Sequence, residues 1–410
     1  MSLIQPFAGL RPAPGRAAEV AAPPYDVLNT AEARRLVEGR PWSFLHISRA
    51  EVDLPEDTDP YAPEVYAKAH ENLERMLAEG VLVRDPEPYY YVYRLIRGEH
   101  VQTGLVVSAS IADYDAGRIK KHEFTRPSKE DDRVRQIQAL DAQTGPVLLV
   151  HRATPDIDRT LAAVAADQPP EVDITAADGV RHQLWPVVGR GVIEHLTQAF
   201  ERLDSLYIAD GHHRSAAASR VAASRRCGDS DAETHQGFLA VVFPHDQMRI
   251  LDYNRLVRDL NDLDVGSFLE RLAACFVVES SAAPVAPERP GVFGMYLQGV
   301  WYRLTLSDAI PPAADPVAAL DVSRLQEHLL GPILGIQDPR RDERIDFVGG
   351  IRGLDGLTAR VDSGEMAVAF ALHPTRLEEL MAVADRGEVM PPKSTWFEPK
   401  LADGLVSLVL

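Results

Sequence analysis

The stretch YIADGHHRSAAASR, residues 207–220, determines how the rest of this sequence is interpreted. Residues 205–209 are apolar enough for a short buried strand, which Asp210 and Gly211 bring to an end. The alanine-rich segment that follows favours a helix over residues 211–226. Two histidines and an arginine therefore stand at a tight joint between a strand and the start of a helix.

This joint has the chemistry of an anion site. The first turn of a helix exposes main-chain N–H groups and a partial positive charge. Gly211 has no Cβ, so a ligand can approach the main chain closely. Arg214 adds a planar fork that matches phosphate oxygens, and His212 and His213 add further donors. We therefore predict that residues 210–214 form a phosphate cradle.

Other interpretations of the joint stay open from the residues alone. Asp210 can be an ordinary helix N-cap, with both histidines in a partly exposed loop. It can also hold a histidine in one tautomer or join a metal site. A zinc cage is disfavoured because His212 and His213 are adjacent, and successive side chains seldom converge on one ion.

A second polar cluster, KKHEFTRPSKEDDR, occupies residues 120–133. Glu123 lies among basic and apolar neighbours, next to His122 and ahead of a helix start at Pro127. A partly desolvated carboxylate at this position can take a proton from a hydroxyl group. The competing interpretation is a solvated, charged helix face.

A third cluster, MPPKSTWFEPK, occupies residues 390–400. Its prolines restrict the loop that carries Lys393, Ser394 and Thr395. A lysine held with little conformational freedom suits a phosphate group. A structural turn is the alternative.

Near the N-terminus, AAPPYDV at residues 21–27 places Tyr25 and Asp26 directly after two prolines. The prolines fix an extended backbone there. The two side chains can line a pocket, or the segment can simply begin a strand.

Composition excludes several classes of protein. The chain has 410 residues and a net charge of -18, which argues against general affinity for nucleic acid, since that requires a basic footprint. No apolar run reaches the ~18 residues that span a bilayer, and the first residues lack the layout of a signal peptide. With Cys227 and Cys275 as its two cysteines, we expect a reduced, cytoplasmic protein without a membrane partner.

Hydrophobic periodicity and turn residues predict the remaining elements. Strands and helices are interspersed without strict alternation, which favours an α+β fold over a doubly wound sheet. The predicted helices are 60–79, 128–142, 191–203, 211–226 and 323–334. The predicted strands are 145–152, 205–209, a hairpin over 89–114 that turns at Gly98, and pairs within 238–257 and 294–306.

Taken together, the four quoted segments resemble one family. AAPPYDV, KKHEFTRPSKEDDR, IADGHHR and MPPKSTWFEPK look like the DUF1015 family, whose relatives include free-serine kinases on a ParB/sulfiredoxin-like fold. The resemblance spans nearly the whole chain. It implies that Glu123, paired with His122, is the catalytic base on a serine hydroxyl. It also implies that the nucleotide phosphates are held by Asp210, His212, His213 and Arg214.

The resemblance further implies a division into domains. We expect an N-terminal extension with the β-hairpin over residues 1–117 and a ParB/sulfiredoxin-like catalytic core over 118–280. A C-terminal α/β domain over 281–410 would close the site. The extension and the segment around 152–190 have no counterpart in the short kinases, and both can reshape the acceptor pocket.

The sequence thus predicts a small-molecule kinase that converts L-serine and a nucleotide to O-phospho-L-serine. We expect Mg²⁺ on the phosphates with Asp210 as its ligand, and ATP or ADP as donor, with pyrophosphate also open. The expected substrate-binding residues are Arg126, Lys393, Ser394, Thr395, Tyr25 and Asp26. A ParB-like nucleotide-binding regulatory protein is the alternative. The oligomeric state stays open, although exposed strand edges in α+β proteins often pair into a homodimer. The kinase hypothesis requires the Glu123 carboxyl group to lie near the helix start.

Overall fold

The computed structural model describes residues 2–226 and 236–410 and divides into two compact units. The first unit comprises Met1–Met248 and Pro399–Leu410, and the second comprises Arg249–Glu398. Both mix helices and strands, so the predicted α+β class is confirmed. Cys275 is a free thiol, whereas Cys227 lies outside the described residues.

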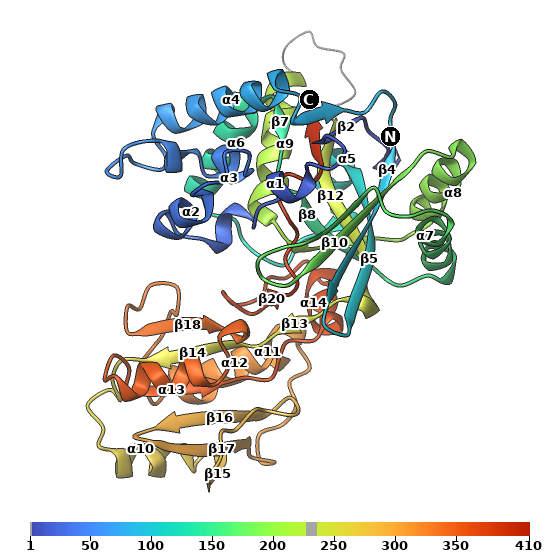
Figure 1. The fold of residues 1–410 in the computed structure, drawn as a ribbon. Coiled ribbons are helices and arrows are strands. Elements are labelled where there is room, and N and C mark those ends of the chain that lie inside the picture. The colour runs from blue at the N-terminus through green and yellow to red at the C-terminus, as the bar shows by residue number, and fades with distance from the viewer. Residues whose placement is uncertain (1, 227–235) are drawn as a thin grey trace. The chain divides into compact units, whose positions relative to one another are not determined.

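The described part of the first unit is built on a nine-stranded sheet (Figure 1). Its strand order is β6-β11-β8-β12-β5-β4-β10-β9, and β1 pairs with β5. Continuous apolar sequence makes β12 a central strand that is buried along its length. The strands are β1 (Ile4–Gln5), β4 (Tyr90–Arg97), β5 (His100–Ser110), β6 (Ile119–Lys120), β8 (Val147–His151), β9 (Val172–Thr175), β10 (Arg181–Val187), β11 (Leu206–Asp210) and β12 (Gly237–Pro244).

A smaller sheet in the same unit has the order β3-β2-β21-β7 and joins both ends of the chain (Figure 1). These strands are β2 (Gly9–Pro12), β3 (Leu82–Arg84), β7 (Ala142–Gln143) and β21 (Ser407–Val409). The helical segments of the unit are α1 (Ala17–Val20), η1 (Tyr25–Val27), α2 (Thr30–Val37), α3 (Leu45–Ser48), η2 (Ala50–Asp53), α4 (Pro63–Ala78), α5 (Ile111–Asp115), α6 (Pro127–Leu140), α7 (Pro155–Asp167), α8 (Arg190–Glu201), α9 (His212–Arg226) and η4 (His245–Gln247).

The second unit contains a six-stranded sheet with the order β15-β17-β16-β19-β14-β18 and a short β13-β20 pair. Its strands are β13 (Ile250–Leu251), β14 (Tyr253–Val257), β15 (Phe276–Ser281), β16 (Val292–Leu297), β17 (Val300–Leu306), β18 (Ile345–Gly349), β19 (Val368–Ala371) and β20 (Trp396–Phe397). Its helical segments are α10 (Val265–Leu272), α11 (Pro316–Ala319), α12 (Asp321–Leu325), η5 (Gln326–Leu330), η6 (Gly350–Arg352), α13 (Asp355–Asp362) and α14 (Leu377–Asp385).

Local sequence signals explain several of these elements. The predicted hairpin is confirmed: Arg97 pairs with His100 across a tight turn in which Gly98 has φ +59°. The predicted helix over 60–79 is also confirmed. It begins with Pro63 at its first turn and is followed by Gly80, whose φ is +63°.

The predicted domain boundaries do not match the two units. Strand β5, from the expected N-terminal extension, pairs with β12 of the expected core, so a boundary at 117/118 would divide one sheet. Strand β10, from the segment treated as an insertion, pairs with β4 along its full length. A boundary at 280/281 would fall inside β15, and residues 399–410 return to the first unit. These boundaries depend on strand pairing between segments that are far apart in the sequence, and local sequence patterns do not predict that pairing.

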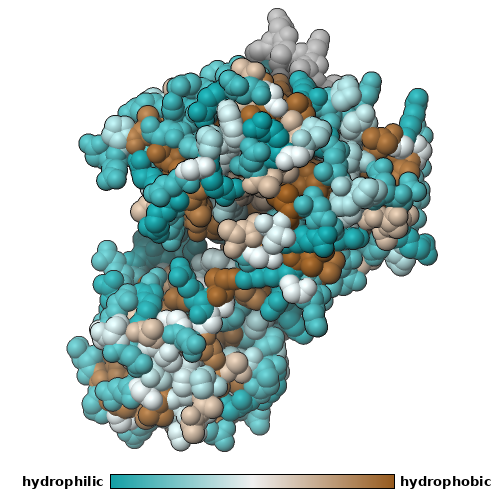
Figure 2. Space-filling model, in the orientation of Figure 1, coloured by the Kyte–Doolittle hydropathy of each residue, from teal (hydrophilic) through white to brown (hydrophobic). Residues whose placement is uncertain are grey.

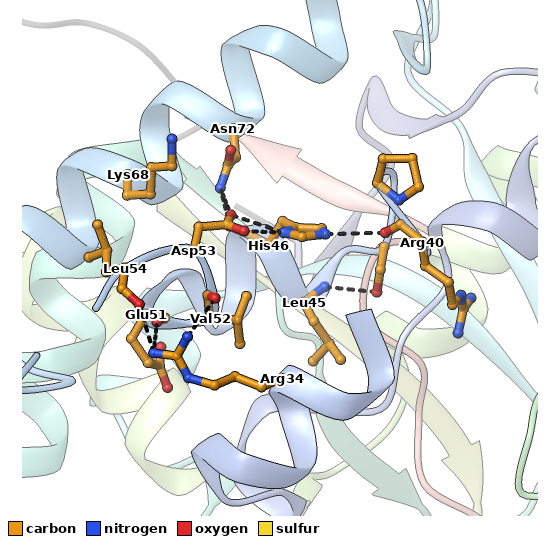
Figure 3. Close-up of polar contacts among 12 residues, drawn as sticks. Arg34, Arg40, Leu45, His46, Glu51, Val52, Asp53, Leu54, Lys68 and Asn72 are labelled. Carbon is orange, nitrogen blue, oxygen red and sulfur yellow. Dashed lines mark hydrogen bonds and ion pairs between the residues drawn. The ribbon is translucent and has the colours of Figure 1, made fainter. Parts of the chain in front are cut away.

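A partly buried polar network holds α3 and η2 together in the first unit (Figure 3). Nδ1 of His46 lies 2.9 Å from both carboxylate oxygens of Asp53, and its Nε2 lies 3.1 Å from the carbonyl oxygen of Arg40. Both ring nitrogens thus face hydrogen-bond acceptors. Asn72 of α4 donates to Asp53 and to the carbonyl of His46. Burial opposes ionisation of Asp53, but the bonds from His46 outweigh it and lower the pKa of that carboxyl group.

We expect His46→Ala to lower the free energy of unfolding by about 2–4 kcal/mol, because it leaves Asp53 and the Arg40 carbonyl without their shared donor. Urea denaturation measures this. His70→Ala is the matched control, since His70 is exposed on α4, and it should change stability by less than about 0.5 kcal/mol. Equal effects of the two substitutions would contradict the role given to the network.

Candidate active site

Two neighbouring strands bring the first two sequence clusters together. Strands β6 and β11 are parallel, with Ile119 paired to Leu206 and Lys120 paired to Tyr207. The chain therefore leaves both strands at the same edge of the sheet. The loop at 121–126 leads from β6 into α6, and the joint at Gly211 leads from β11 into α9. This register places Glu123 beside the helix start, as the kinase hypothesis requires.

Both histidines of the joint bind the main chain of this loop. Nε2 of His212 accepts a hydrogen bond from the N–H of His122 at 3.3 Å. Nε2 of His213 accepts from the N–H of Arg126 at 3.0 Å. A neutral imidazole has one acceptor and one donor nitrogen, so each ring carries its proton on Nδ1. The pair fastens the loop to the start of α9.

This arrangement revises the role predicted for the two histidines. Their Nε2 atoms serve the protein's own main chain, and only Nδ1–H remains as a donor to a ligand. Burial lowers the pKa of His212 well below its ordinary value, and the nearby His122 ring adds to the effect. Burial also lowers the pKa of His213. Both rings are therefore neutral near pH 7, as acceptors of N–H bonds must be.

The carboxylate of Glu123 lies at the mouth of this joint. Its Oε2 is 3.8 Å from Nδ1 of His212, and its side chain is 53% exposed. The Nδ1–H of His212 thus faces the carboxylate, while solvent reaches the other side. A half-exposed carboxylate that faces a fixed donor is suited to receive a proton from a bound hydroxyl group.

His122, Glu123 and His212 together present nitrogen and oxygen atoms within 4.8 Å of one another, a spacing that a metal ion could use. The hydrogen bonds of His212 argue against metal binding. With Nε2 of His212 occupied by a main-chain N–H, its Nδ1 holds the proton and cannot also be a ligand. These three residues do not fit a metal cage in this conformation.

His122 is a packing partner inside the site. Its ring is 3% exposed and meets the His212 ring edge-on, with centroids 4.4 Å apart. Burial lowers the pKa of His122 to about 4, so the ring is neutral near pH 7. Its main-chain N–H, rather than its side chain, makes the contact that positions Glu123.

Asp210 lies in a network of charges. One carboxylate oxygen is 3.1 Å from Nζ of Lys400, and the other is 3.7 Å from the guanidinium of Arg214. Arg214 also lies 3.9 Å from Asp26 and donates to the carbonyl of Pro146. Burial opposes ionisation of Asp210, but Lys400 and Arg214 outweigh it and hold its pKa below the ordinary value. Asp210 therefore orients the charged groups of Lys400 and Arg214, a different role from that of an ordinary helix N-cap.

Gly211 meets two constraints. Its φ is +100°, in the left-handed region where a Cβ is strained. A Cβ there would also lie 3.0 Å from Nε of Arg214, whose guanidinium folds back over the turn. The close approach of Arg214 to the main chain thus depends on glycine at this position.

The other expected substrate residues divide between the two units. Tyr25 and Asp26 form part of η1 in the first unit, where the guanidinium of Arg133 stacks 3.9 Å from the Tyr25 ring. Tyr25 lines a pocket and Asp26 does not, and the segment forms a short helical turn in place of a strand. Substrate binding by the two residues stays a prediction. Arg126 is exposed at the N-cap of α6 and contributes its main-chain N–H.

Lys393, Ser394 and Thr395 belong to the second unit. Lys393 is exposed with φ +58°, and its carbonyl accepts from Arg255 at 2.9 Å. The hydroxyl of Ser394 donates to the carbonyl of Pro391 at 2.7 Å. The loop is therefore held rigidly, as its prolines suggested, and its part in substrate binding stays a prediction.

Sequence reasoning missed Lys400, the lysine of the same quoted segment that pairs with Asp210. Pro399 directly before it is the signal that could have drawn attention to it, because Lys393 likewise follows a proline. It also missed Arg133 and Asp403, which line the pocket beside Arg214.

The family model of the proteins of unknown function DUF1015 matches residues 4–323. The chain belongs to the DUF1015 family. No curated protein matches it. None of the helices that the structure describes has the length and apolar content needed to cross a bilayer.

Several solved structures are similar to this chain at low scores. A free serine kinase in complex with AMP is 15% identical with a TM-score of 0.35, covering 71% of this chain and 86% of that one. A mutant free serine kinase in complex with ADP is 16% identical with a TM-score of 0.34, covering 74% and 90%. C-terminally truncated SbnI from Staphylococcus aureus is 13% identical with a TM-score of 0.38, covering 74% and 87%. At these scores, the function must be argued from the site itself.

Neutral histidines in the site make stability depend on pH. The unfolded chain takes up a proton on each histidine near the ordinary pKa of about 6.5, whereas folded His122 does so only near 4. Lowering the pH through this window therefore favours the unfolded state, by up to about 1.4 kcal/mol per pH unit for each such histidine.

We expect His122→Gln to reduce the slope of unfolding free energy against pH between pH 4.5 and 6, measured by urea denaturation at each pH. The buried residues His151 and His182, whose pKa values burial also lowers to about 4, keep part of the slope in the variant. His70→Gln removes an exposed histidine and should leave the slope unchanged. An unchanged slope in the His122 variant would contradict a neutral buried ring.

Proposed function

We propose that this protein is a phosphotransferase that moves a phosphoryl group from ATP or ADP to the hydroxyl group of free L-serine. The observation that supports this proposal most is the position of Glu123: its carboxylate lies at the mouth of the strand-to-helix joint, 3.8 Å from His212. Family membership is consistent with it. We also propose that the first unit contains a ParB/sulfiredoxin-like core.

The donor phosphates would bind at the start of α9. The first-turn N–H groups and the partial charge of the helix attract an anion, and Gly211 allows close approach. Arg214 is held beside this turn by Asp26 and Asp210, with its fork near the phosphate position. Nδ1–H of His213 would add a neutral donor.

Glu123 would act as the base. As the serine oxygen forms its bond to phosphorus, its proton moves to the Glu123 carboxylate, and the bond between phosphorus and the nucleotide oxygen breaks toward the nucleotide. His212 would act as a positioning residue, since its Nδ1–H faces Glu123 and its Nε2 holds the loop. Phosphoryl transfer depends mainly on such positioning and on charge neutralisation.

Asp210 and Asp26 would hold Mg²⁺. This ion usually keeps several waters and takes one or two carboxylates beside a phosphate, and these two side chains flank Arg214. When bound, Mg²⁺ supplies charge neutralisation on the phosphate oxygens. Both carboxylates already face cations, so Lys400 and Arg214 would have to share them with the ion.

We expect Glu123→Gln to lower the rate of phosphoserine formation by about 10²–10⁴-fold, because the amide cannot accept the proton. Mass spectrometry of reactions with L-serine, Mg²⁺ and either ATP, ADP or pyrophosphate measures it. AMP affinity should change by less than about twofold, since nucleotide binding does not use this side chain. Glu99→Gln, at the hairpin turn, is the control.

Two outcomes would contradict this assignment. Normal turnover by the Glu123 variant would rule out its role as base. Nucleotide binding by the wild-type protein without phosphoserine from any of the three donors would favour a nucleotide-binding regulatory protein instead.

We expect Gly211→Ala to weaken AMP binding by about tenfold or more, because a Cβ displaces Arg214 from the turn. Isothermal titration calorimetry measures this. Gly117→Ala is a matched control, since Gly117 also has positive φ (+80°) but open space around its Cβ position. Equal AMP affinity in both variants would contradict the phosphate site at Gly211.

A further inference from the structure

A polar pocket adjoins the cradle within the first unit. The pocket is partly open to solvent, and Arg214 forms part of its wall. The rest of the wall comes from segments outside the predicted catalytic core as well as within it: Tyr25 of η1, Ser48 of α3, Arg133 of α6 and Asp403 of the C-terminal segment. Arg214 thus faces both the cradle and this pocket.

Two buried oxygen atoms of the wall lack partners among the residues that the structure describes. Asp403 is 1% exposed and Ser48 is 7% exposed, yet neither Oδ1 of Asp403 nor Oγ of Ser48 has a hydrogen bond. Buried polar groups are nearly always satisfied, and an exception calls for a missing partner. Oδ1 of an ionised Asp403 can only accept a hydrogen bond, so its missing partner is a donor, whereas the Ser48 hydroxyl can accept or donate.

Hydrogen bonds hold the main chain at both residues. Asp403 and Ala22 exchange main-chain hydrogen bonds of 3.1 and 2.9 Å. Ser48 ends α3, which the His46 network holds (Figure 3), and Gln136 of α6 donates to the carbonyl of Ile47 at 2.9 Å. The backbone that carries the two side chains is therefore anchored, as a binding site requires.

Charge in and around the pocket favours a cationic group near Asp403. Burial raises the pKa of Asp403 to about 7, and Asp26 adds to this, while Arg214 and Arg133 oppose it. The cations present are already shared: Arg133 pairs with Asp132 at 2.8 Å, and Arg214 lies near Asp26 and Asp210. An ammonium group would stabilise the ionised carboxylate.

The two guanidinium groups complete a recognition pattern. Arg133 already donates to Asp132 through Nε and Nη2, and Arg214 donates to the carbonyl of Pro146 through Nη1, so a ligand carboxylate would bind the other guanidinium N–H groups of the two residues. Asp403 with Ser48 offers acceptors for an ammonium group. A molecule with both groups is an α-amino acid zwitterion. Tyr25 is no open platform for a nucleotide base, because the Arg133 guanidinium covers one face of its ring at 3.9 Å.

We propose that this pocket is the amino-acid subsite of the protein, with Asp403 and Ser48 binding the ammonium group of the acceptor and Arg133 and Arg214 binding its carboxylate. This inference rests on the proposed function for the choice of L-serine as the amino acid. It assigns acceptor recognition to the N-terminal and C-terminal segments of the first unit.

Calorimetric titration of the full chain tests the proposal without any need for turnover. The ligands are L-serine, 3-hydroxypropionate, which lacks the ammonium group, and AMP. The variants are Asp403→Asn and Ser48→Ala, with Asp173→Asn as the control, since Asp173 pairs with Arg181 at 2.6 Å at the far edge of the sheet. Thermal unfolding and AMP affinity verify that each variant is folded.

We expect Asp403→Asn to weaken L-serine binding by about 10- to 100-fold and Ser48→Ala by about 2- to 10-fold. The wild-type protein should prefer L-serine to 3-hydroxypropionate, and the Asp403 variant should bind the two alike. AMP affinity should stay within about twofold in all variants, and the control should match the wild type.

The proposal is overturned if the wild-type protein does not bind L-serine at millimolar concentration or if the Asp403 variant binds it normally. It is also overturned if the Asp403 substitution weakens AMP rather than L-serine, which would assign the pocket to the nucleoside. Asp403-dependent binding of L-serine without phosphoserine formation would remove the kinase function and keep the subsite. Phosphoserine formation with an unchanged serine KM in the Asp403 variant would keep the kinase function and remove the subsite.

Discussion

Two main-chain N–H groups, those of His122 and Arg126, donate to the two histidines that begin α9, and the geometry of the site depends on these bonds. Adjacent side chains on a helix point in different directions, so consecutive histidines reach two points of the same loop. Each ring must stay neutral to accept, and burial keeps it so. These two hydrogen bonds therefore set the distance between Glu123 and the start of α9.

The charges around Asp210 bear on how a chain with a net charge of -18 could hold the proposed phosphate ligand. Hydrophilic residues cover most of the face shown in Figure 2, whereas Arg214 and Lys400 are largely buried beside Asp210. Buried ion pairs contribute little net stability because desolvation offsets their attraction. Their value here is orientation: the carboxylate fixes two cations in the vicinity of Gly211.

The sequence predicted the joint well because its signals are local. An apolar run, Asp210-Gly211 and an alanine-rich segment determine strand, turn and helix within a few residues. The position of Glu123 was also predictable from the family resemblance. The hydrogen-bond partners of the histidine Nε2 atoms were not predictable, because they depend on the parallel register of β6 and β11. Likewise, Asp403 and Ser48 meet in one pocket only through the tertiary fold, and their sequence neighbourhoods contain no motif.

The order of the chain has a consequence for biosynthesis. The second unit, Arg249–Glu398, lies between Arg214 and the segment that supplies Lys400 and Asp403. A ribosome must therefore translate that whole unit before Asp210 can meet Lys400 or the smaller sheet can receive β21. Until then the nascent first unit has an open sheet edge and incompletely compensated buried charges. Folding of the first unit is therefore tied to completion of the inserted unit, and the contacts around Asp210 form only after Lys400 has been added.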